Sequence, residues 1–397
     1  MRGRDEMDDN QFLNCFIQLP SIDLKIAFYN QQQYQDCQIY LFDEDSSNLG
    51  FIDTPIRYGR YVLISPSDYS KFWVINKKTA NYRNHYLKII KEINLDLNTL
   101  TYLNNLLFNK TDKICRIPDL NNFILFMEKV KKDGYYINIA SSLLEATQNN
   151  TDHELICEMI TSCYAFNCLD FNSLKEFSFE NLTSHEKREI DGYKNTYSLV
   201  NDEYHQKRFN CVVCYLLKAF FLKNDKSVSQ KEKIELFKKY CLEEISIFLE
   251  LEMRVLILYL SNDQTVSKTF EKLQLNAKNL YKKILNTASD ICQLRSLEEV
   301  FVLKNEEEEN IYRMQYFLSL DSGLLNLFND NPISLIFVKN GRTTTIRQKK
   351  QTDLFTEKEL MAYVQSKPIR AQKVHQIDFD KELDKLKTEL DGMLNSI

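Results

Sequence analysis

The stretch Ile93-Asn-Leu-Asp-Leu-Asn-Thr-Leu-Thr-Tyr-Leu103 joins an apolar run that ends in an acid to a new helical period beginning at Leu100. The apolar residues before Asp96 predict a strand, and the polar Asn98 and Thr99 predict the start of a helix. Asp96 then lies at the carboxyl end of its strand. Ligands of open α/β sheets bind in the crevice beyond the strand ends, so Asp96 is a candidate site residue.

The segments that follow alternate between helix and strand. Apolar periodicity predicts helices at Thr99–Phe108 and Leu120–Lys132, and the β-prone run Tyr135–Ala140 predicts the next strand. Ser141–Ala146 then has a helical pattern and carries Glu145. This alternation is typical of a parallel sheet, and the chain has only 8 Gly and 6 Pro. We therefore expect a helix-rich α/β protein.

A long segment without strand patterns separates this region from a second α/β region. Residues 149–282 predict a helical insertion packed on itself. Asn286–Phe301 is an amphipathic helix with Asp290 near its start, and the strand pattern Tyr316–Leu320 is followed directly by Asp321. Residues 93–148 and 283–340 are thus the predicted halves of one core.

Two further regions flank this core. Residues 1–92 predict an N-terminal α+β module, or an elaboration of the core, because β-prone runs alternate with turn formers. The region 341–397 is predicted to contain a basic loop and C-terminal helices. The basic loop pattern itself covers Lys339–Gln351. The β-prone runs of the first region are Phe12–Leu19, Lys25–Tyr29, Gln38–Phe42, Tyr61–Ile64 and Phe72–Ile75.

Composition restricts the class of protein. The 397 residues are 44% hydrophobic and 27% charged, which is typical of globular chains, and the net charge of -5 excludes a uniformly basic nucleic-acid coat. The segment Met1–Gln11 is charged and no apolar segment of signal-peptide type follows it. Ten Cys at irregular spacing are expected to be reduced thiols, so we expect a cytoplasmic protein without a membrane partner.

Four acids recur in similar places, at strand ends or early in helices: Asp96, Glu145, Asp290 and Asp321. If the strands are neighbours, these carboxylates can meet in one cleft. Mg²⁺ and Mn²⁺ prefer oxygen ligands, and several carboxylates in one cleft are not all ionised comfortably without a cation. A metal-bound water could then attack a phosphodiester.

The same residues resemble the motifs of PIN-like nuclease domains. Asn94–Leu103 is similar to their first motif, Tyr136–Ala146 to the second, Asn286–Leu297 to the third and Tyr316–Leu325 to the fourth. This resemblance implies a three-layer α/β/α core with a parallel sheet, and cleavage of RNA, or less often DNA, that depends on Mg²⁺ or Mn²⁺. It also implies that Asp96, Glu145, Asp290 and Asp321 are the catalytic metal ligands. Many members of the family act as toxins or in antiviral defence against phage.

A second hypothesis belongs to another class. Acids at strand ends and helix starts also cap helices, so the chain could be a non-catalytic, mostly helical interaction protein or adaptor. A homo-oligomer or a regulatory protein partner is compatible with either hypothesis. Four polar side chains are candidates for contacts to substrate, although local turns or a solvated loop are the more common explanation of such residues: Asn98, Ser322, Arg342 and Arg347.

Other motifs give weaker predictions. Cys211-Val-Val-Cys214 has C-x-x-C spacing but lies in an apolar helical run without a second pair, so buried thiols are expected. Glu298 and Glu299 are expected on a solvated helix face. The sequence contains no Gly-rich phosphate loop, which argues against P-loop and Rossmann nucleotide binding.

Overall fold

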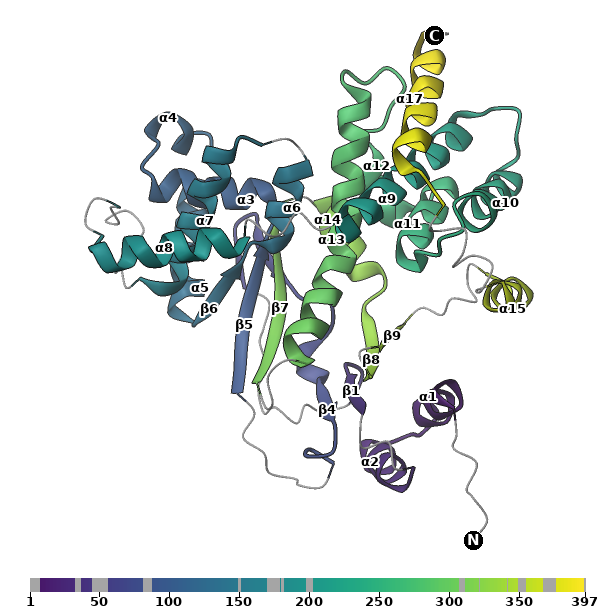
Figure 1. Cartoon of the computed structure of the whole chain (residues 1–397), viewed down its shortest axis with the longest axis horizontal. Helices are drawn as coiled ribbons and strands as arrows, with labels where there is room; N and C mark the ends of the chain where they lie inside the picture. The colour runs from purple at the N-terminus through teal and green to yellow at the C-terminus, as the bar shows by residue number, and fades with distance from the viewer. Residues whose placement is uncertain are drawn as a thin grey trace.

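The computed structural model describes residues 8–32, 37–44, 56–80, 88–148, 151–169, 179, 182–197, 203–306, 311–320, 322–340, 342–348, 355–366 and 376–395. These residues form a helix-rich α/β protein with two sheets, shown in Figure 1. Within the described ranges, no helix is both long enough and apolar enough to cross a membrane.

The larger sheet has five strands in the order β2-β3-β7-β5-β6. Its central strand β5 is parallel to both β6 and β7, whereas β3 is antiparallel to β7. The predicted parallel arrangement is therefore confirmed for the three strands β5, β6 and β7, but the sheet as a whole is mixed. The strands are β2 (Arg57–Tyr58), β3 (Tyr61–Ile64), β5 (Lys88–Leu95), β6 (Tyr135–Asn138) and β7 (Ile311–Ser319).

One group of helices packs on this sheet around an apolar core. Ile93 and Leu95 of β5 are fully buried there against Leu100, Leu103 and aromatic residues of neighbouring helices. Their burial removes apolar surface from water, which is the main favourable term in folding. The helices are α3 (Leu97–Leu107), α4 (Thr111–Ile114), α5 (Leu120–Lys132), α6 (Ala140–Gln148), α7 (His153–Cys168) and α8 (Ser184–Tyr197).

A second group of helices forms a separate apolar core on the other side of β7, as Figure 1 shows. Successive side chains of a strand point to opposite faces, so Tyr316 and Leu318 join the first core and Phe317 joins the second. Between α6 and α13 the described residues are helical or irregular, as predicted, but α7 and α8 pack in the first core and not on the rest of the predicted insertion, residues 149–282. The helices are α9 (Glu203–Asn224), α10 (Gln230–Lys239), the π-helical turn η3 (Tyr240–Glu244), α11 (Glu250–Leu260), α12 (Gln264–Phe270), α13 (Leu280–Glu306), α14 (Ser322–Asp330) and α17 (Phe379–Asn395).

The second sheet has four antiparallel strands in the order β4-β1-β8-β9. Strands β1 and β4 of this sheet come from residues 1–92, as does β3 of the larger sheet. Each of the two sheets also contains strands from residues 311–347. The N-terminal region is thus part of the same sheets as the second half of the core, while the domain division itself stays a prediction. The strands are β1 (Cys37–Leu41), β4 (Trp73–Ile75), β8 (Ile333–Lys339) and β9 (Arg342–Arg347), and the 3-10 turn η1 is Tyr69–Lys71.

Two predicted strands of the N-terminal region were wrong. The runs Phe12–Leu19 and Lys25–Tyr29 lie mainly in helices α1 (Asp9–Ile17) and α2 (Ile22–Gln31). Asp8 and Gln11 form a reciprocal capping box that starts α1, and Phe12 and Phe16 stack one helical turn apart. Helix capping therefore overrides the β preference of the aromatic residues.

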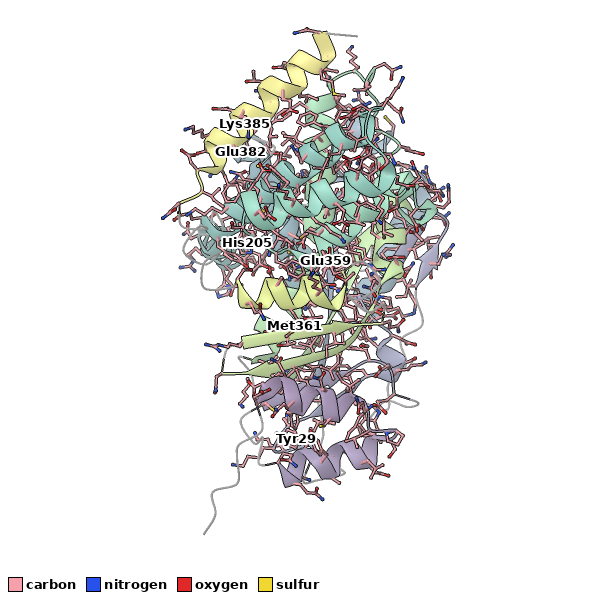
Figure 2. All side chains as sticks on the ribbon, turned by 90° about the vertical axis from the view of Figure 1, so that its right-hand side faces the viewer. Tyr29, His205, Glu359, Met361, Glu382 and Lys385 are labelled. Atoms are coloured by element: carbon pink, nitrogen blue, oxygen red, sulfur yellow. The ribbon has the colours of Figure 1, made fainter. Side chains whose placement is uncertain are left out.

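The predicted loop Lys339–Gln351 was also wrong in part, because β9 forms a hairpin with β8. Its β-branched residues Thr343, Thr344 and Thr345 pair along β8, which fits their strand preference. A further helix, α15 (Glu357–Gln365), begins with the predicted capping box of Thr356 and Glu359. In Figure 2 α15 lies between the hairpin and the helical insertion, with Tyr29 and Lys385 toward opposite ends of the molecule.

Candidate functional site

Asp96 follows β5 directly and is the N-cap of α3. Its Oδ1 accepts hydrogen bonds from the Thr99 backbone amide at 2.6 Å and from the Thr99 hydroxyl at 2.7 Å. Its Oδ2 accepts one from the Ser319 hydroxyl at 2.5 Å, and Ser319 is the last residue of β7. The carboxylate therefore caps a helix and is also held against the neighbouring strand, at the carboxyl ends of two parallel strands.

Glu145 lies on α6, which follows the adjacent parallel strand β6. The backbone amide of Leu97, the residue after Asp96, is near its carboxylate and moderates the rise in its pKa. The Gln293 side chain donates to its Oε2 at 3.4 Å. Burial first, and then the nearby negative charges of Asp290 and Asp96, together raise the pKa of Glu145 to about 8.

Asp290 lies on α13, one helical turn before Gln293. Its Oδ2 is 2.8 Å from the ammonium group of Lys272, which follows α12. This lysine supplies one positive charge to the acids. The structure thus brings together three of the four predicted acids, Asp96, Glu145 and Asp290, from three separate helices.

The fourth predicted acid, Asp321, and the side chain of Ser322 lie outside the described residues. The chain on both sides of Asp321 is described. Ser319 contacts Asp96, and Gly323 packs so closely on α12 that a Cβ there would lie 2.8 Å from the Thr269 backbone nitrogen.

The predicted substrate contacts are separated. Asn98 is exposed in the first turn of α3, close in sequence to Asp96. Arg342 and Arg347 lie instead on the edge strand of the four-stranded sheet. Arg342 is exposed, whereas Arg347 forms an ion pair with Glu298 at 2.6 Å.

A small pocket of about 20 Å³ adjoins Glu145, which is enough for a water-sized molecule. Ser141 Oγ and Gln293 Oε1 line this pocket, are buried, and have no hydrogen-bond partner among the described residues. Buried polar atoms in proteins are normally satisfied by protein or by ordered water, so these two atoms are suited to a small polar ligand. The lining residues are Ser141, Leu144, Glu145, His205, Arg208, Phe209, Ser289, Cys292, Gln293 and Ser296.

The oxygen atoms of the side chains around Glu145 are of the kinds that bind a hard divalent cation. They are carboxylate, amide and hydroxyl oxygens, and the charges of Asp290 and Asp96 add to burial in raising the pKa of Glu145. Over the described ranges, however, no three His, Cys, Asp or Glu side chains are placed to hold one metal ion, and Asp321 is not among the residues compared. Cys211 and Cys214 are buried in α9, which agrees with the prediction of buried thiols.

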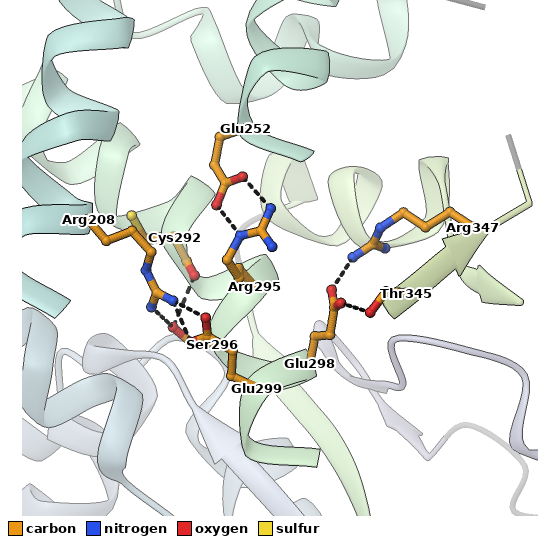
Figure 3. Close-up of polar contacts among 9 residues, drawn as sticks. All are labelled: Arg208, Glu252, Cys292, Arg295, Ser296, Glu298, Glu299, Thr345 and Arg347. Atoms are coloured by element: carbon orange, nitrogen blue, oxygen red, sulfur yellow. Dashed lines mark hydrogen bonds and ion pairs between the residues drawn. The ribbon is translucent and has the colours of Figure 1, made fainter. Parts of the chain in front are cut away.

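Local sequence reasoning missed the ion pairs that hold α13 in place, shown in Figure 3. Arg295 donates two hydrogen bonds to Glu252 of α11 at 2.7 and 2.8 Å. Glu299 pairs with Arg208 of α9, and Glu298 accepts hydrogen bonds from Arg347 and Thr345 of β9. The prediction that Glu298 and Glu299 form a solvated face was wrong, because their partners lie far away in sequence.

A buried polar row on β5 was also missed. Glu92, Asn94 and Asp96 alternate along the strand, so all three side chains share one face. Glu92 pairs with Arg313 at 2.9 Å, and Gln315 donates to Glu92 at 3.0 Å while accepting from Asn94 at 2.9 Å. The period-two polar pattern was the available signal. This row ties β5 to β7 directly below the candidate site.

No protein-family model, no curated protein and no solved structure matches this chain. The geometry of the site therefore carries the functional argument.

Proposed function

We propose that this chain is a metal-dependent nuclease with a PIN-like core, which hydrolyses phosphodiester bonds in RNA in preference to DNA. One observation carries the proposal. Asp96, Glu145 and Asp290 are far apart in sequence but close enough at the carboxyl ends of parallel strands for Glu145 to interact electrostatically with both of the others. An interacting acid cluster of this kind is a common feature of catalytic sites.

In this proposal Asp96, Glu145, Asp290 and Asp321 would hold Mg²⁺ or Mn²⁺. A bound ion of this type supplies an activated water and neutralises the charge that develops on the phosphodiester. Thr99 and Ser319 orient the Asp96 carboxylate, and Gln293 donates a hydrogen bond to that of Glu145. Glu145 must release its proton to act as a ligand, so metal affinity is expected to rise with pH up to about 8.

The resemblance to PIN-like domains also motivates a role for the protein as a toxin or an antiviral defence effector. The helical insertion contributes Lys272 and His205 to the surroundings of the acids, so it would shape the access of substrate. This part of the proposal depends on finding nuclease activity first.

A second candidate function has its own supporting observations. Asp96 is a helix cap and Asp290 is already paired with Lys272, as expected if the acids only stabilise the fold of an interaction protein. Under this alternative, substitution of Lys272 or Glu145 would change the stability of the protein, and the protein would have no enzymatic activity to lose.

The test is cleavage of labelled single-stranded RNA and DNA by purified protein, with Mn²⁺, with Mg²⁺ or with chelator. Asp96→Asn removes the charge but keeps a side chain that caps helices well, and Glu145→Gln keeps the shape of Glu145. Glu389→Gln, on the exposed side of α17, is the matched control. We expect metal-dependent cleavage of RNA by wild type and control only.

Cleavage that persists in Asp96→Asn and Glu145→Gln would assign the activity elsewhere. An absence of both cleavage and metal-induced stabilisation in the wild-type protein would favour the interaction-protein alternative.

A further inference from the structure

The β2–β3 hairpin brings residues of the N-terminal region to the edge of the sheet where the acids lie. Tyr58 pairs with Tyr61, so the turn consists of Gly59 and Arg60. Val62 pairs with Ser319, the residue whose hydroxyl contacts Asp96. Because β3 is antiparallel to β7, its turn lies at the carboxyl end of β7.

Close packing fixes this turn in place. Gly59 has a φ of +54°, and a Cβ on it would lie 2.2 Å from Asp119 Oδ2 and 2.6 Å from Asn122 Nδ2. The Tyr61 hydroxyl donates to the carbonyl of Pro118, just before α5. The turn is therefore anchored to the start of α5, and the backbone position of Arg60 is well defined.

Arg60 is exposed and makes no ion pair with any other described residue. It lies close enough to Tyr61 and Tyr102 to influence their pKa values, and the charge of Asp96 influences the same two tyrosines in the opposite direction. Burial is the main cause that raises the pKa of both tyrosines, and the smaller contributions of Arg60 and Asp96 indicate that both charges are near them.

Most other arginines near the core are not available for a ligand. Arg208, Arg254, Arg295, Arg313 and Arg347 each lie within ion-pair distance of a carboxylate of the chain. Lys272 is likewise paired with Asp290. Arg60 therefore differs from these cations: it lies on a turn at the carboxyl end of β7 and has no carboxylate partner in the described structure.

We propose that Arg60 binds a backbone phosphate of single-stranded nucleic acid next to the phosphodiester held at the acids. This inference rests on the proposed nuclease function. A planar guanidinium suits bidentate phosphate recognition, and phosphate contacts fix the register of a strand without reading its sequence. A polyanion approaching several carboxylates also needs a cation at the entrance, and the N-terminal hairpin supplies one.

The experiment measures binding of a labelled 12-nucleotide single-stranded RNA by fluorescence anisotropy, in chelator so that no cleavage occurs, over a series of salt concentrations. The variants are Arg60→Ala, Arg60→Gln and Arg60→Lys. Arg57→Ala is the matched control, because Arg57 is exposed on the same hairpin and carries the same charge. Thermal unfolding of each variant verifies that it folds.

We expect Arg60→Ala and Arg60→Gln to weaken binding about 5- to 10-fold and to reduce the slope of log K against log salt by about 0.7, as for one lost phosphate contact. Arg60→Lys retains part of the affinity, and Arg57→Ala binds like wild type. Equal binding by wild type and both neutral variants overturns the role of Arg60 and leaves the nuclease proposal intact. If the wild-type protein neither binds nor cleaves any nucleic acid, the proposed function and this inference both fail.

Discussion

Replacing Glu145 with glutamine is expected to stabilise the metal-free protein strongly at pH 9 and only slightly at pH 5. The folded state raises the pKa of Glu145 from 4.5 to about 8, mainly because the side chain is buried and then because Asp290 and Asp96 are negatively charged. Between these pH values the folded protein holds more protons than the unfolded chain. Its stability therefore falls as pH rises from about 4.5 to 8.

The magnitude follows from the same two pKa values. One pKa unit corresponds to about 1.4 kcal/mol, so ionised Glu145 lowers the free energy of unfolding by up to about 5 kcal/mol. About 1 kcal/mol of this penalty is already present at pH 5, and the rest develops by pH 9. Glutamine has no such titration. The difference in stability between Glu145→Gln and wild type should therefore grow by up to about 4 kcal/mol between pH 5 and pH 9.

The assay is urea unfolding of both proteins in chelator at pH 5, 7 and 9, with Glu389→Gln as control. Exposed Glu389 should show the same small difference at every pH. A stability difference between Glu145→Gln and wild type that does not change with pH would refute the assignment of a raised pKa to Glu145 in the folded protein. Mn²⁺ at pH 9 should stabilise wild type more than the variant, because it offsets the buried charge.

Four further outcomes are expected from thermal or chemical unfolding. Gly59→Ala should destabilise the protein by about 1–3 kcal/mol, because of its positive φ and the contact with Asp119, whereas Gly192→Ala in the open middle of α8 should stabilise it by about 0.5–1 kcal/mol. Arg295→Ala should destabilise by about 3–5 kcal/mol, because Glu252 would be left buried without its partner; no loss would show that Glu252 is neutral in the fold. The double variant Arg295→Met with Glu252→Leu should recover most of that loss, and failure to recover it would mean that packing around the pair matters more than charge.

Local sequence patterns were sufficient for most elements of the core. The helix Leu120–Lys132 has the predicted bounds, because its apolar periodicity is regular and Asp133-Gly134 ends it. Asp96 was identified because an apolar run ends in an acid just before a helical pattern begins, and this change is visible along the chain. Where aromatic residues occur in both kinds of element, as in α1, capping decided the structure and strand preference alone gave a wrong prediction.

The sequence by itself indicated the three parallel strands, the helical character of the described residues between 151 and 282, and the positions of Asp96, Glu145 and Asp290 at strand ends or on helices. Only the tertiary structure decided that these acids interact, that Glu298 and Glu299 pair with distant arginines, and that the β2–β3 hairpin brings Arg60 to the site. The physical reason is the range of the forces involved. Propensity, capping and periodicity act within a few residues, whereas burial, electrostatic interaction and strand pairing join residues that are hundreds of positions apart.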